Sequence, residues 1–281
     1  MPELTDLSYV RALCEKYDFA LSKGFGQNFI VNPGLPPKIV DASGVDKRYG
    51  VLEIGPGIGA LSHELCERAG KVVAVELDKT LLPILDETMA RFDNFEVVSA
   101  DILKTDIPAL VREKFAGLTP IVCANLPYNI TTPAITALIE SKCFESITVL
   151  VQKEVAERLC AAPGTSAYGA FSVFMQYYTE PEYLFAVPRE CFEPQPKVTS
   201  AVLRAVVRRK PPVEVEDEKF FFRVVYAAFA LRRKTLVNSL MTAFGSQLTK
   251  EQVTQAVTSC GLEANIRGER LGLSEFAALS A

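Results

Sequence analysis

The chain has 281 residues, of which 49% are hydrophobic and 23% charged, as in an ordinary soluble globular protein. No apolar run approaches the ~20 residues of a membrane-spanning helix, and the acidic start, residues 1–6, lacks the apolar segment of a signal peptide. Seven cysteines without a Cys-x-x-Cys pair indicate a reducing cytoplasm, with neither a disulfide framework nor a metal site.

The net charge of −4 is unevenly distributed along the chain. Residues 1–203 contain 18 basic and 26 acidic side chains, whereas residues 204–281 contain 12 and 8. Two basic clusters, Arg208–Lys210 and Arg232–Lys234, lie in the C-terminal part. Such clusters are usually solvated faces, but they are also compatible with a surface that binds RNA phosphates.

The first half of the chain alternates between helical and short apolar patterns. An amphipathic helix is predicted over residues 6–17, and a loop rich in glycine and amides over residues 23–30. Five strands are predicted, at residues 51–54, 72–76, 95–99, 120–124 and 147–151. Helices follow the first two strands, up to about residue 69 and over residues 79–91. This alternation predicts a doubly wound, Rossmann-like α/β fold with a parallel sheet.

The second half becomes helical. Helices are predicted over residues 153–160 and 171–178, followed by strands over 182–187 and 200–207. The pair Pro211-Pro212 marks a linker. Beyond it only helices are predicted, at residues 217–231, 234–244, 249–260 and 274–279. We therefore expect two domains, residues 1–208 with the sheet and residues 209–281 as a small all-helical domain that binds RNA.

Glycine and polar residues follow four of the predicted strands at the point where each strand ends. They are the turn Gly55-Pro56-Gly57-Ile58-Gly59 and the side chains of Glu76, Asp101 and Asn125. The carboxyl ends of parallel strands meet at one edge of a sheet, where open α/β sheets bind ligands. Glycines before a helix allow a ligand to approach closely, and Glu76 can accept both hydroxyls of a ribose. The sequence therefore predicts a nucleotide-like cofactor at this edge.

Two cofactors fit this pattern, a dinucleotide and S-adenosylmethionine. The spacing Gly55-x-Gly57-x-x-Ala60 loosely matches the dinucleotide fingerprint, so the glycines alone do not decide. Asp101, after the third strand, can accept a hydrogen bond from an adenine amine. The stretch after the fourth strand presents a methyl acceptor, which a hydride-transferring enzyme does not need. These features favour S-adenosylmethionine, with a dinucleotide oxidoreductase as an alternative.

That stretch, Asn125-Leu126-Pro127-Tyr128, suits the exocyclic amine of a flat base. The Asn125 side-chain oxygen and the Leu126 carbonyl can accept its two N–H bonds, Pro127 fixes the turn, and Tyr128 can stack on the ring. Two such acceptors would pull the hydrogens out of the ring plane and direct the nitrogen lone pair at a sulfonium methyl. This is catalysis by positioning and electrostatics, without a strong base or a metal.

In their order and spacing, these motifs resemble the ribosomal RNA adenine dimethylase family. Two further stretches carry the resemblance over nearly the whole chain, Gly26-Gln27-Asn28-Phe29 and Phe192-Glu193-Pro194-Gln195-Pro196-Lys197-Val198. Ile30 is a conservative departure from the leucine of many relatives. The chain looks closest to the bacterial branch that dimethylates two adjacent adenines near the 3′ end of 16S rRNA, and its helical tail with Phe229–Leu236 is similar to that branch.

The resemblance implies a site and a set of partners. It places S-adenosylmethionine against Asn28, Ile30, Gly55, Glu76, Asp101 and Asn125, and Gly57 of the same turn is a further candidate. It implies that Tyr128 and Phe192 enclose the target adenine, next to Leu126 and Pro127. The expected enzyme is a monomeric cytoplasmic protein of ribosome biogenesis that binds 16S rRNA or a precursor of the small subunit. The alternatives are a 23S rRNA adenine methylase of the resistance type and a non-catalytic RNA-binding or assembly factor.

Overall fold

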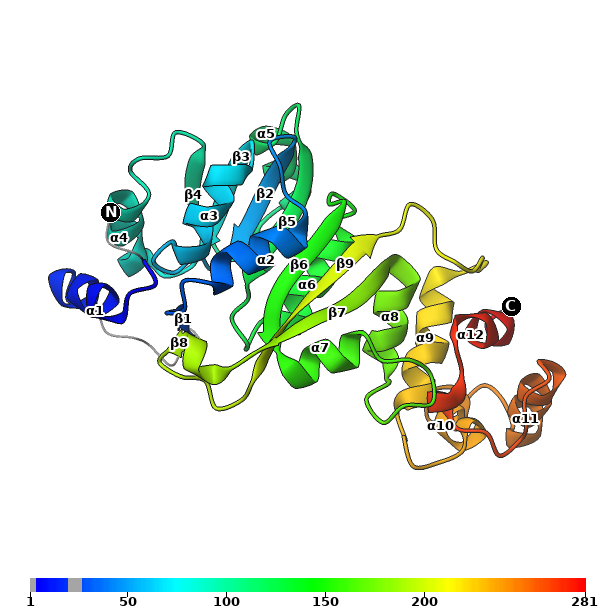
Figure 1. Cartoon of the computed structure of the whole chain (residues 1–281). Helices are drawn as coiled ribbons and strands as arrows, with labels where there is room; N and C mark the ends of the chain where they lie inside the picture. Colours follow the sequence, from blue (N-terminus) through cyan, green and yellow to red (C-terminus); the bar gives the residue numbers. More distant parts are fainter. Residues whose placement is uncertain (1–3, 20–26) are drawn as a thin grey trace. The chain divides into compact units, whose positions relative to one another are not determined.

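The computed structural model describes residues 4–19 and 27–281 (Figure 1). The chain forms two compact units. Unit 1 consists of residues 1–156 and 182–207, and unit 2 of residues 157–181 and 208–281. Among the described residues no helix is long and apolar enough to cross a membrane.

Unit 1 is organised on a seven-stranded sheet with the strand order β4-β3-β2-β5-β6-β9-β7. The strands are β2 (Tyr49–Ile54), β3 (Lys71–Glu76), β4 (Phe95–Ser99), β5 (Thr119–Asn125), β6 (Ser146–Gln152), β7 (Thr179–Val187) and β9 (Ser200–Val207). The first five pair in parallel, which confirms the predicted doubly wound, Rossmann-like fold. β9 pairs antiparallel with β6 and so extends the parallel sheet.

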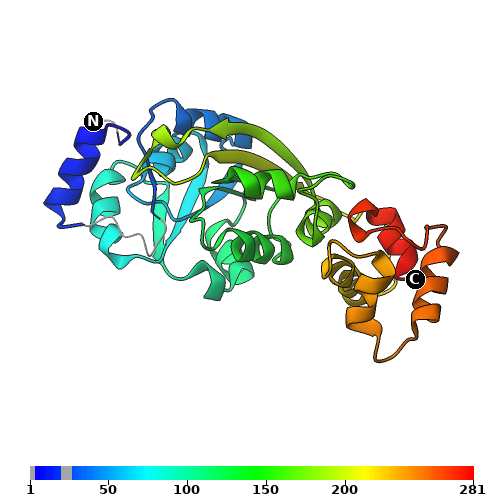
Figure 2. The same ribbon diagram turned by 90° about the horizontal axis from the view of Figure 1, so that it is seen from below.

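Helices flank this sheet on both sides (Figures 1 and 2). They are α2 (Leu35–Ser43), α3 (Ala60–Arg68), α4 (Leu82–Thr88), α5 (Ile107–Lys114) and α6 (Thr131–Glu140). α1 (Leu7–Lys16) packs on Leu81 and Ile84 next to α4, and α7 (Lys153–Leu159) follows β6. The chain moves outward from β2 to β4 and then returns to β5 on the other side of β2. Because parallel crossovers are right-handed, this reversal puts α3 and α4 on one face and α5 and α6 on the other. The reversal between β2 and β5 is the switch point at which such sheets bind ligands.

Several local predictions need correction. The helix predicted over residues 79–91 is a 3₁₀ turn, Lys79–Leu81, followed by α4, which ends at Thr88. The predicted loop 23–30 ends in a short strand, β1 (Phe29–Ile30), and residues 23–26 lie outside the described part. β1 is a strand because it pairs antiparallel with β8 (Phe192–Glu193), more than 160 residues further along the chain.

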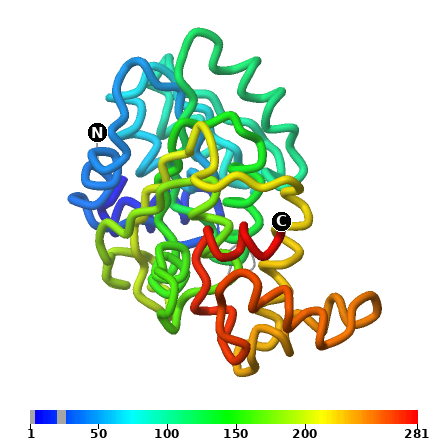
Figure 3. Tube along the Cα trace, turned by 90° about the vertical axis from the view of Figure 1, so that its right-hand side faces the viewer, coloured from blue at the N-terminus to red at the C-terminus, as the bar shows by residue number. Residues whose placement is uncertain are grey.

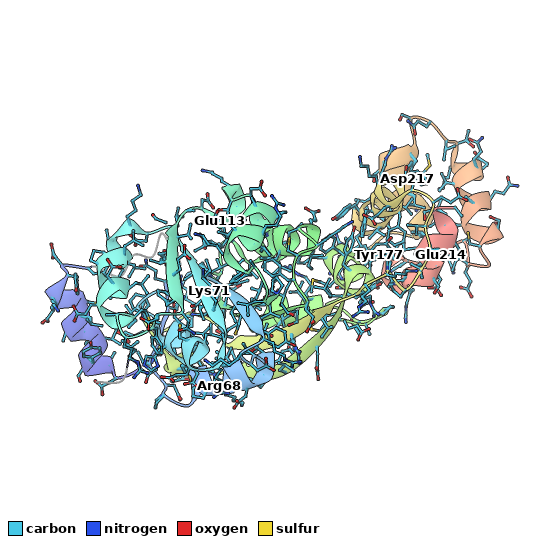
Figure 4. The ribbon with its side chains drawn as sticks, turned by 90° about the horizontal axis from the view of Figure 1, so that it is seen from above. Arg68, Lys71, Glu113, Tyr177, Glu214 and Asp217 are labelled. Atoms are coloured by element: carbon cyan, nitrogen blue, oxygen red, sulfur yellow. The ribbon has the colours of Figure 1, made fainter. Side chains whose placement is uncertain are left out.

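Two glutamates of the parallel sheet, Glu96 near the amino ends of the strands and Glu53 near their carboxyl ends, differ in their charge partners. At the amino edge the Glu96 carboxylate lies 3.0 Å from the Lys71 amine and 2.5 Å from that of Lys114. Lys71 is labelled in Figure 4. At the carboxyl edge Glu53, at 1% exposure, has an oxygen without a partner among the described residues. Two ammonium groups therefore neutralise Glu96, whereas Glu53 is buried without a basic partner among the described residues.

Unit 2 is helical, and its chain can be followed from α9 (yellow) to α12 (red) in Figure 3. Its helices are α8 (Ala170–Tyr178), α9 (Glu218–Phe229), α10 (Leu236–Phe244), α11 (Lys250–Ser259) and α12 (Leu273–Leu279). All five were predicted. Asp217 caps α9 by accepting from the backbone N–H groups of Lys219 and Phe220, at 2.8 and 3.0 Å. Tyr177 and Asp217 are labelled in Figure 4.

The compact units differ from the expected domains in the placement of residues 157–181. Tyr177 of α8 packs on Phe221 of α9, with 5.1 Å between the ring centroids. The Tyr168 hydroxyl donates to the carbonyl of Leu271 at 3.0 Å. These contacts group α8 with the C-terminal helices by packing, which a linker-based reading of the sequence does not detect. The functional division at residue 208 stays a prediction.

Candidate active site

A cavity of about 180 Å³ opens at the carboxyl edge of the parallel strands of unit 1. The glycine-rich turn, the ends of β2, β3 and β5, and the segment before β1 line it. All seven residues predicted to hold a cofactor are among its lining, namely Asn28, Ile30, Gly55, Gly57, Glu76, Asp101 and Asn125. One water needs ~10–15 Å³ on such a scale, so the cavity has room for a ligand of many atoms.

The glycine-rich turn needs its glycines for both conformation and space. Gly55 and Gly57 have φ angles of +68° and +60°, in the left-handed region that favours glycine. A Cβ atom at Gly55 would lie 3.4 Å from Pro127, and one at Gly57 would lie 3.0 Å from the ring of Phe29. The turn is thus packed between the Asn125–Tyr128 stretch and β1, and its backbone forms one wall of the cavity.

Glu76 ends β3 and is 6% exposed. Its Oε1 accepts from the backbone N–H of Asp78 at 2.8 Å. Burial raises the pKa of Glu76, and the backbone N–H groups of Asp78, Gly57 and Leu77 oppose that rise. Asp78 in turn accepts from the Gln27 side chain at 2.9 Å, which ties the segment before β1 to the end of β3. The Glu76 carboxyl group is therefore fixed in the cavity wall, where it can accept hydrogen bonds from a ligand.

Asp101 follows β4 and caps the short helical turn Ile102–Lys104. Its Oδ1 accepts from the backbone N–H of Leu103 at 3.0 Å, and its Oδ2 lies 3.5 Å from the Lys104 amine. The side chain is 27% exposed and lines the cavity. A carboxylate held in this way still has lone pairs for an amine of a ligand.

Asn125, the last residue of β5, is oriented by the segment before β1. Its side-chain nitrogen donates to the backbone carbonyl of Asn28 at 3.1 Å. The bond uses the donor end of the amide, so the oxygen remains available as an acceptor. Leu126 is 1% exposed, and its carbonyl accepts no hydrogen bond from any described residue. Two acceptors are therefore adjacent in the chain at one wall of the cavity.

The two predicted stacking residues differ in their surroundings. Tyr128 is half-buried, and its hydroxyl lies 2.5 Å from that of Ser200. Phe192 is 1% exposed, belongs to the core of unit 1 and pairs with Ile30 across β1 and β8. Neither lines the cavity. That the two rings enclose an adenine stays a prediction, and for Phe192 it requires the ring to leave its core position.

Glu53 is a residue of the site that the sequence reasoning missed. It lies in β2, two residues before Gly55, and it lines the cavity. Its Oε2 has no hydrogen-bond partner among residues 4–19 and 27–281. Burial raises its pKa to about 8; the Ser62 hydroxyl beside the carboxyl group opposes the rise, and the nearby Glu76 carboxylate adds to it. The available signal was an acidic residue inside an otherwise apolar strand, directly before a glycine-rich turn.

No group of three or more histidine, cysteine, aspartate or glutamate side chains in the described part of the chain could hold a metal ion. The cavity contains three acidic side chains, Glu53, Glu76 and Asp101, and none of its described lining residues is basic. Because its pKa is raised to about 8, Glu53 is largely protonated at neutral pH. The site is therefore acidic and rich in hydrogen-bond acceptors.

Comparison with known proteins gives matches along nearly the whole chain. The model of the ribosomal RNA adenine dimethylase family matches residues 19–273. A ribosomal RNA small subunit methyltransferase A from Geobacillus sp. (strain WCH70) is 48% identical over 96% of this chain and 94% of its own length. The protein of the same name from Streptococcus gordonii is 49% identical over 99% of this chain and 97% of its own.

Two solved structures are also similar to this chain. The 23S rRNA methyltransferase ErmE has a TM-score of 0.68 and 26% identity, over 90% of this chain and 98% of that one. A dimethyladenosine transferase from Plasmodium falciparum has a TM-score of 0.74 and 24% identity, over 89% and 95%, which shows the fold. The family match and the two relatives of 48–49% identity show that the chain belongs to the ribosomal RNA adenine dimethylase family, the S-adenosylmethionine-dependent methyltransferases of adenine in ribosomal RNA.

Proposed function

We propose that this protein transfers methyl groups from S-adenosylmethionine to the exocyclic amines of two adjacent adenines in the 16S rRNA of the small ribosomal subunit. Relatives that are 48–49% identical are small-subunit methyltransferases by name. ErmE, whose name gives 23S rRNA as its substrate, is 26% identical. This difference favours the small-subunit branch over the resistance type. A monomer that acts in the cytoplasm on a subunit precursor is part of the proposal.

The observation that carries the cofactor assignment is the charge of the cavity. A dinucleotide brings a doubly negative pyrophosphate, which would meet the carboxylates of Glu76 and Asp101 and no basic side chain of the described lining. S-adenosylmethionine brings a sulfonium and an ammonium group, and the partnerless Oε2 of Glu53 suits a cationic or hydrogen-donating group. The acidic cavity therefore fits S-adenosylmethionine and disfavours the dinucleotide alternative.

The residues present can hold this cofactor by its separate parts. Glu76 would accept hydrogen bonds from the ribose hydroxyls, and Asp101 would accept one from the adenine amine. The backbone at Gly55 and Gly57 would allow the cofactor to approach closely. When bound, S-adenosylmethionine supplies an electrophilic methyl on a sulfonium. Everything else in the reaction depends on how the chain presents the target amine.

An adenine amine is a weak nucleophile because its lone pair is delocalised into the ring. The Asn125 oxygen and the Leu126 carbonyl can accept hydrogen bonds from the two N–H groups of the amine. These bonds would direct the nitrogen lone pair toward the methyl group. The bond from Asn125 to the Asn28 carbonyl fixes which end of the amide faces the amine. Pro127 packs against Gly55, which fixes the stretch against the cofactor turn. The chain thus contributes positioning and electrostatic stabilisation.

A non-catalytic assembly factor is the rival function. It would need no aligned acceptors, yet Asn125 and Leu126 lie in the wall of a cavity that fits the cofactor. The test is to map dimethylated adenines by mass spectrometry in rRNA from cells with and without the gene, and from cells with an Asn125→Ala gene. We expect two adjacent adenines of 16S rRNA to lose both methyl groups in the last two strains. Unchanged methylation in both would refute the proposed function, and loss in 23S rRNA would assign the protein to the other branch.

A further inference from the structure

We propose that Ser200 is a positioning residue for methyl transfer, because its hydroxyl holds the tip of the Tyr128 ring and keeps the stacking face in place before RNA binds. The inference rests on the proposed function, since it assumes that Tyr128 stacks on the target adenine. The two hydroxyl oxygens are 2.5 Å apart. They are separated by 72 residues of sequence, so no local motif links them.

Ser200 is rigidly placed. It is the first residue of β9, is 0% exposed and stands opposite Gln152, the last residue of β6, in the antiparallel ladder. Beside it, the backbone N–H of Lys153 donates to the carbonyl of Thr199 at 2.9 Å. The Ser200 hydroxyl is therefore presented from the sheet itself, at the same edge at which β5 and β6 end.

Tyr128 is also held at its backbone end. The Pro127 carbonyl accepts from the N–H of Ile130 at 3.2 Å, and the Thr131 hydroxyl lies 3.3 Å from the carbonyls of Pro127 and Tyr128. Upstream, the N–H of Leu126 donates to the carbonyl of Leu150 in β6 at 3.1 Å. The first turn of α6 and the end of β6 thus fix the backbone from which the ring extends.

The contact between Tyr128 and Ser200 links parts of the sheet that are not neighbours. β5 and β9 are not neighbours, because β6 lies between them, and adjacent strands are ~4.8 Å apart. Tyr128 lies three residues beyond the end of β5, and its hydroxyl reaches the start of β9, so the chain after β5 and the Tyr128 side chain together span from β5 to β9. A side chain fixed at both ends cannot swing away from this edge.

The chemistry of the pair suits a permanent contact. Burial raises the pKa of Tyr128, so its hydroxyl stays protonated and can donate at neutral pH. Ser200 is 0% exposed, so with phenylalanine at residue 128 its hydroxyl would lose its partner beneath the retained ring. A ring ordered beforehand does not lose rotamer freedom when a base stacks on it, which lowers the cost of capturing the adenine.

The test compares Ser200→Ala, Tyr128→Phe and the double variant with the parent. Small subunits from cells that lack the gene serve as substrate in single-turnover assays. One neutral hydrogen bond corresponds to about a two- to tenfold change, so each single variant should raise the subunit concentration for half-maximal rate by that factor. In Ser200→Ala the rate at saturation and the affinity for S-adenosylmethionine should hardly change. The double variant should be no worse than either single one, and Ser200→Thr should restore capture.

Ser146→Ala is the matched control. Ser146 is also a buried serine, at the amino end of β6 and far along the strand from Gln152. Its loss should leave capture of the subunit unchanged. If Ser200→Ala behaves like Ser146→Ala while Tyr128→Ala impairs capture, or if the effects of Ser200→Ala and Tyr128→Phe add, then Ser200 does not position the ring.

A second readout separates this inference from the proposed function. NMR of ring-labelled tyrosine reports the order of the Tyr128 ring without any substrate. We expect Ser200→Ala, and not Ser146→Ala, to shift and broaden the Tyr128 signal. A parent enzyme that fails to methylate small subunits would refute the proposed function, and an unaltered Tyr128 signal in Ser200→Ala would refute the positioning role.

Discussion

Replacing Asn125 by alanine should remove two interactions of different worth. The first is the acceptor that aims the lone pair of the target amine. The second is the bond from the side-chain nitrogen to the Asn28 carbonyl at 3.1 Å, which holds the segment before β1 against the end of β5. Since Asn125 is only partly buried, little core volume is lost and the variant should fold.

The two losses predict two different magnitudes. Removal of one preorganised polar group from a site of charge development slows catalysis by roughly 10²–10³-fold. Loss of a neutral hydrogen bond such as that to Asn28 corresponds to ~0.5–1.5 kcal/mol, or about a two- to tenfold weaker cofactor affinity. We therefore expect Asn125→Ala to lose far more methyl transfer at saturation than cofactor binding.

Single-turnover assays with saturating subunits and cofactor measure the first loss, and calorimetry measures the second. Asn125→Asp is the matched variant, because it retains acceptor oxygens and lacks the N–H that bonds Asn28. If the acceptor matters most, Asn125→Asp should transfer methyl faster than Asn125→Ala. Transfer at the parental rate by Asn125→Ala would show that the proposed alignment of the amine is wrong.

Four further predictions concern charged residues. Glu76→Ala removes a held acceptor whose hydrogen bonds are worth ~1.5–3 kcal/mol each, so cofactor affinity in calorimetry should fall about ten- to 150-fold while the variant stays folded. Replacing Arg233 and Lys234 by glutamine should weaken RNA binding and lower its salt slope by roughly 0.7–0.9 per lost phosphate contact. Arg232→Gln should instead lower the unfolding temperature, because that guanidinium bonds two backbone carbonyls of unit 2, at 2.7 and 3.0 Å. Burial raises the pKa of Glu53 from 4.5 to about 8, so the folded protein binds this proton more tightly than the unfolded chain does. The free energy of unfolding should therefore decline as pH rises across that range. Glu53→Gln should flatten the decline, as measured by denaturant unfolding at several pH values.

The sequence was sufficient for most of the sheet because its strands are continuous apolar runs, as expected for strands buried on both faces. It was insufficient for α2, α5 and α6, which were not predicted. Each has proline in its first turn, Pro36, Pro108 and Pro133 respectively. Proline is tolerated there because the first N–H groups of a helix have no intrahelical partner, but in a sequence it suggests a loop.

The site was predictable where it depends on strand ends and not where it depends on long-range pairing. Gly55, Glu76, Asp101 and Asn125 follow predicted strands, so topology alone brings them to one edge. The bond between Tyr128 and Ser200 depends on β9 joining the sheet beside β6, which no local pattern reveals. Glu53 was missed because its significance comes from burial beside a cavity and not from its spacing.

The acidic character of the cavity also explains why net charge is a poor guide to this protein's substrate. The carboxylates of Glu76 and Asp101 attract a cationic cofactor and, by the same Coulomb interaction, repel the phosphates of RNA. Phosphates must therefore be bound by side chains outside the described lining of the cavity, and the basic excess of residues 204–281 offers such side chains. Within the cluster Arg232–Lys234, Arg232 has a structural role, because it donates hydrogen bonds to two backbone carbonyls of its own unit. A chain can thus carry a net charge of −4 and still bind RNA, because the acidic groups serve one ligand and the basic groups another.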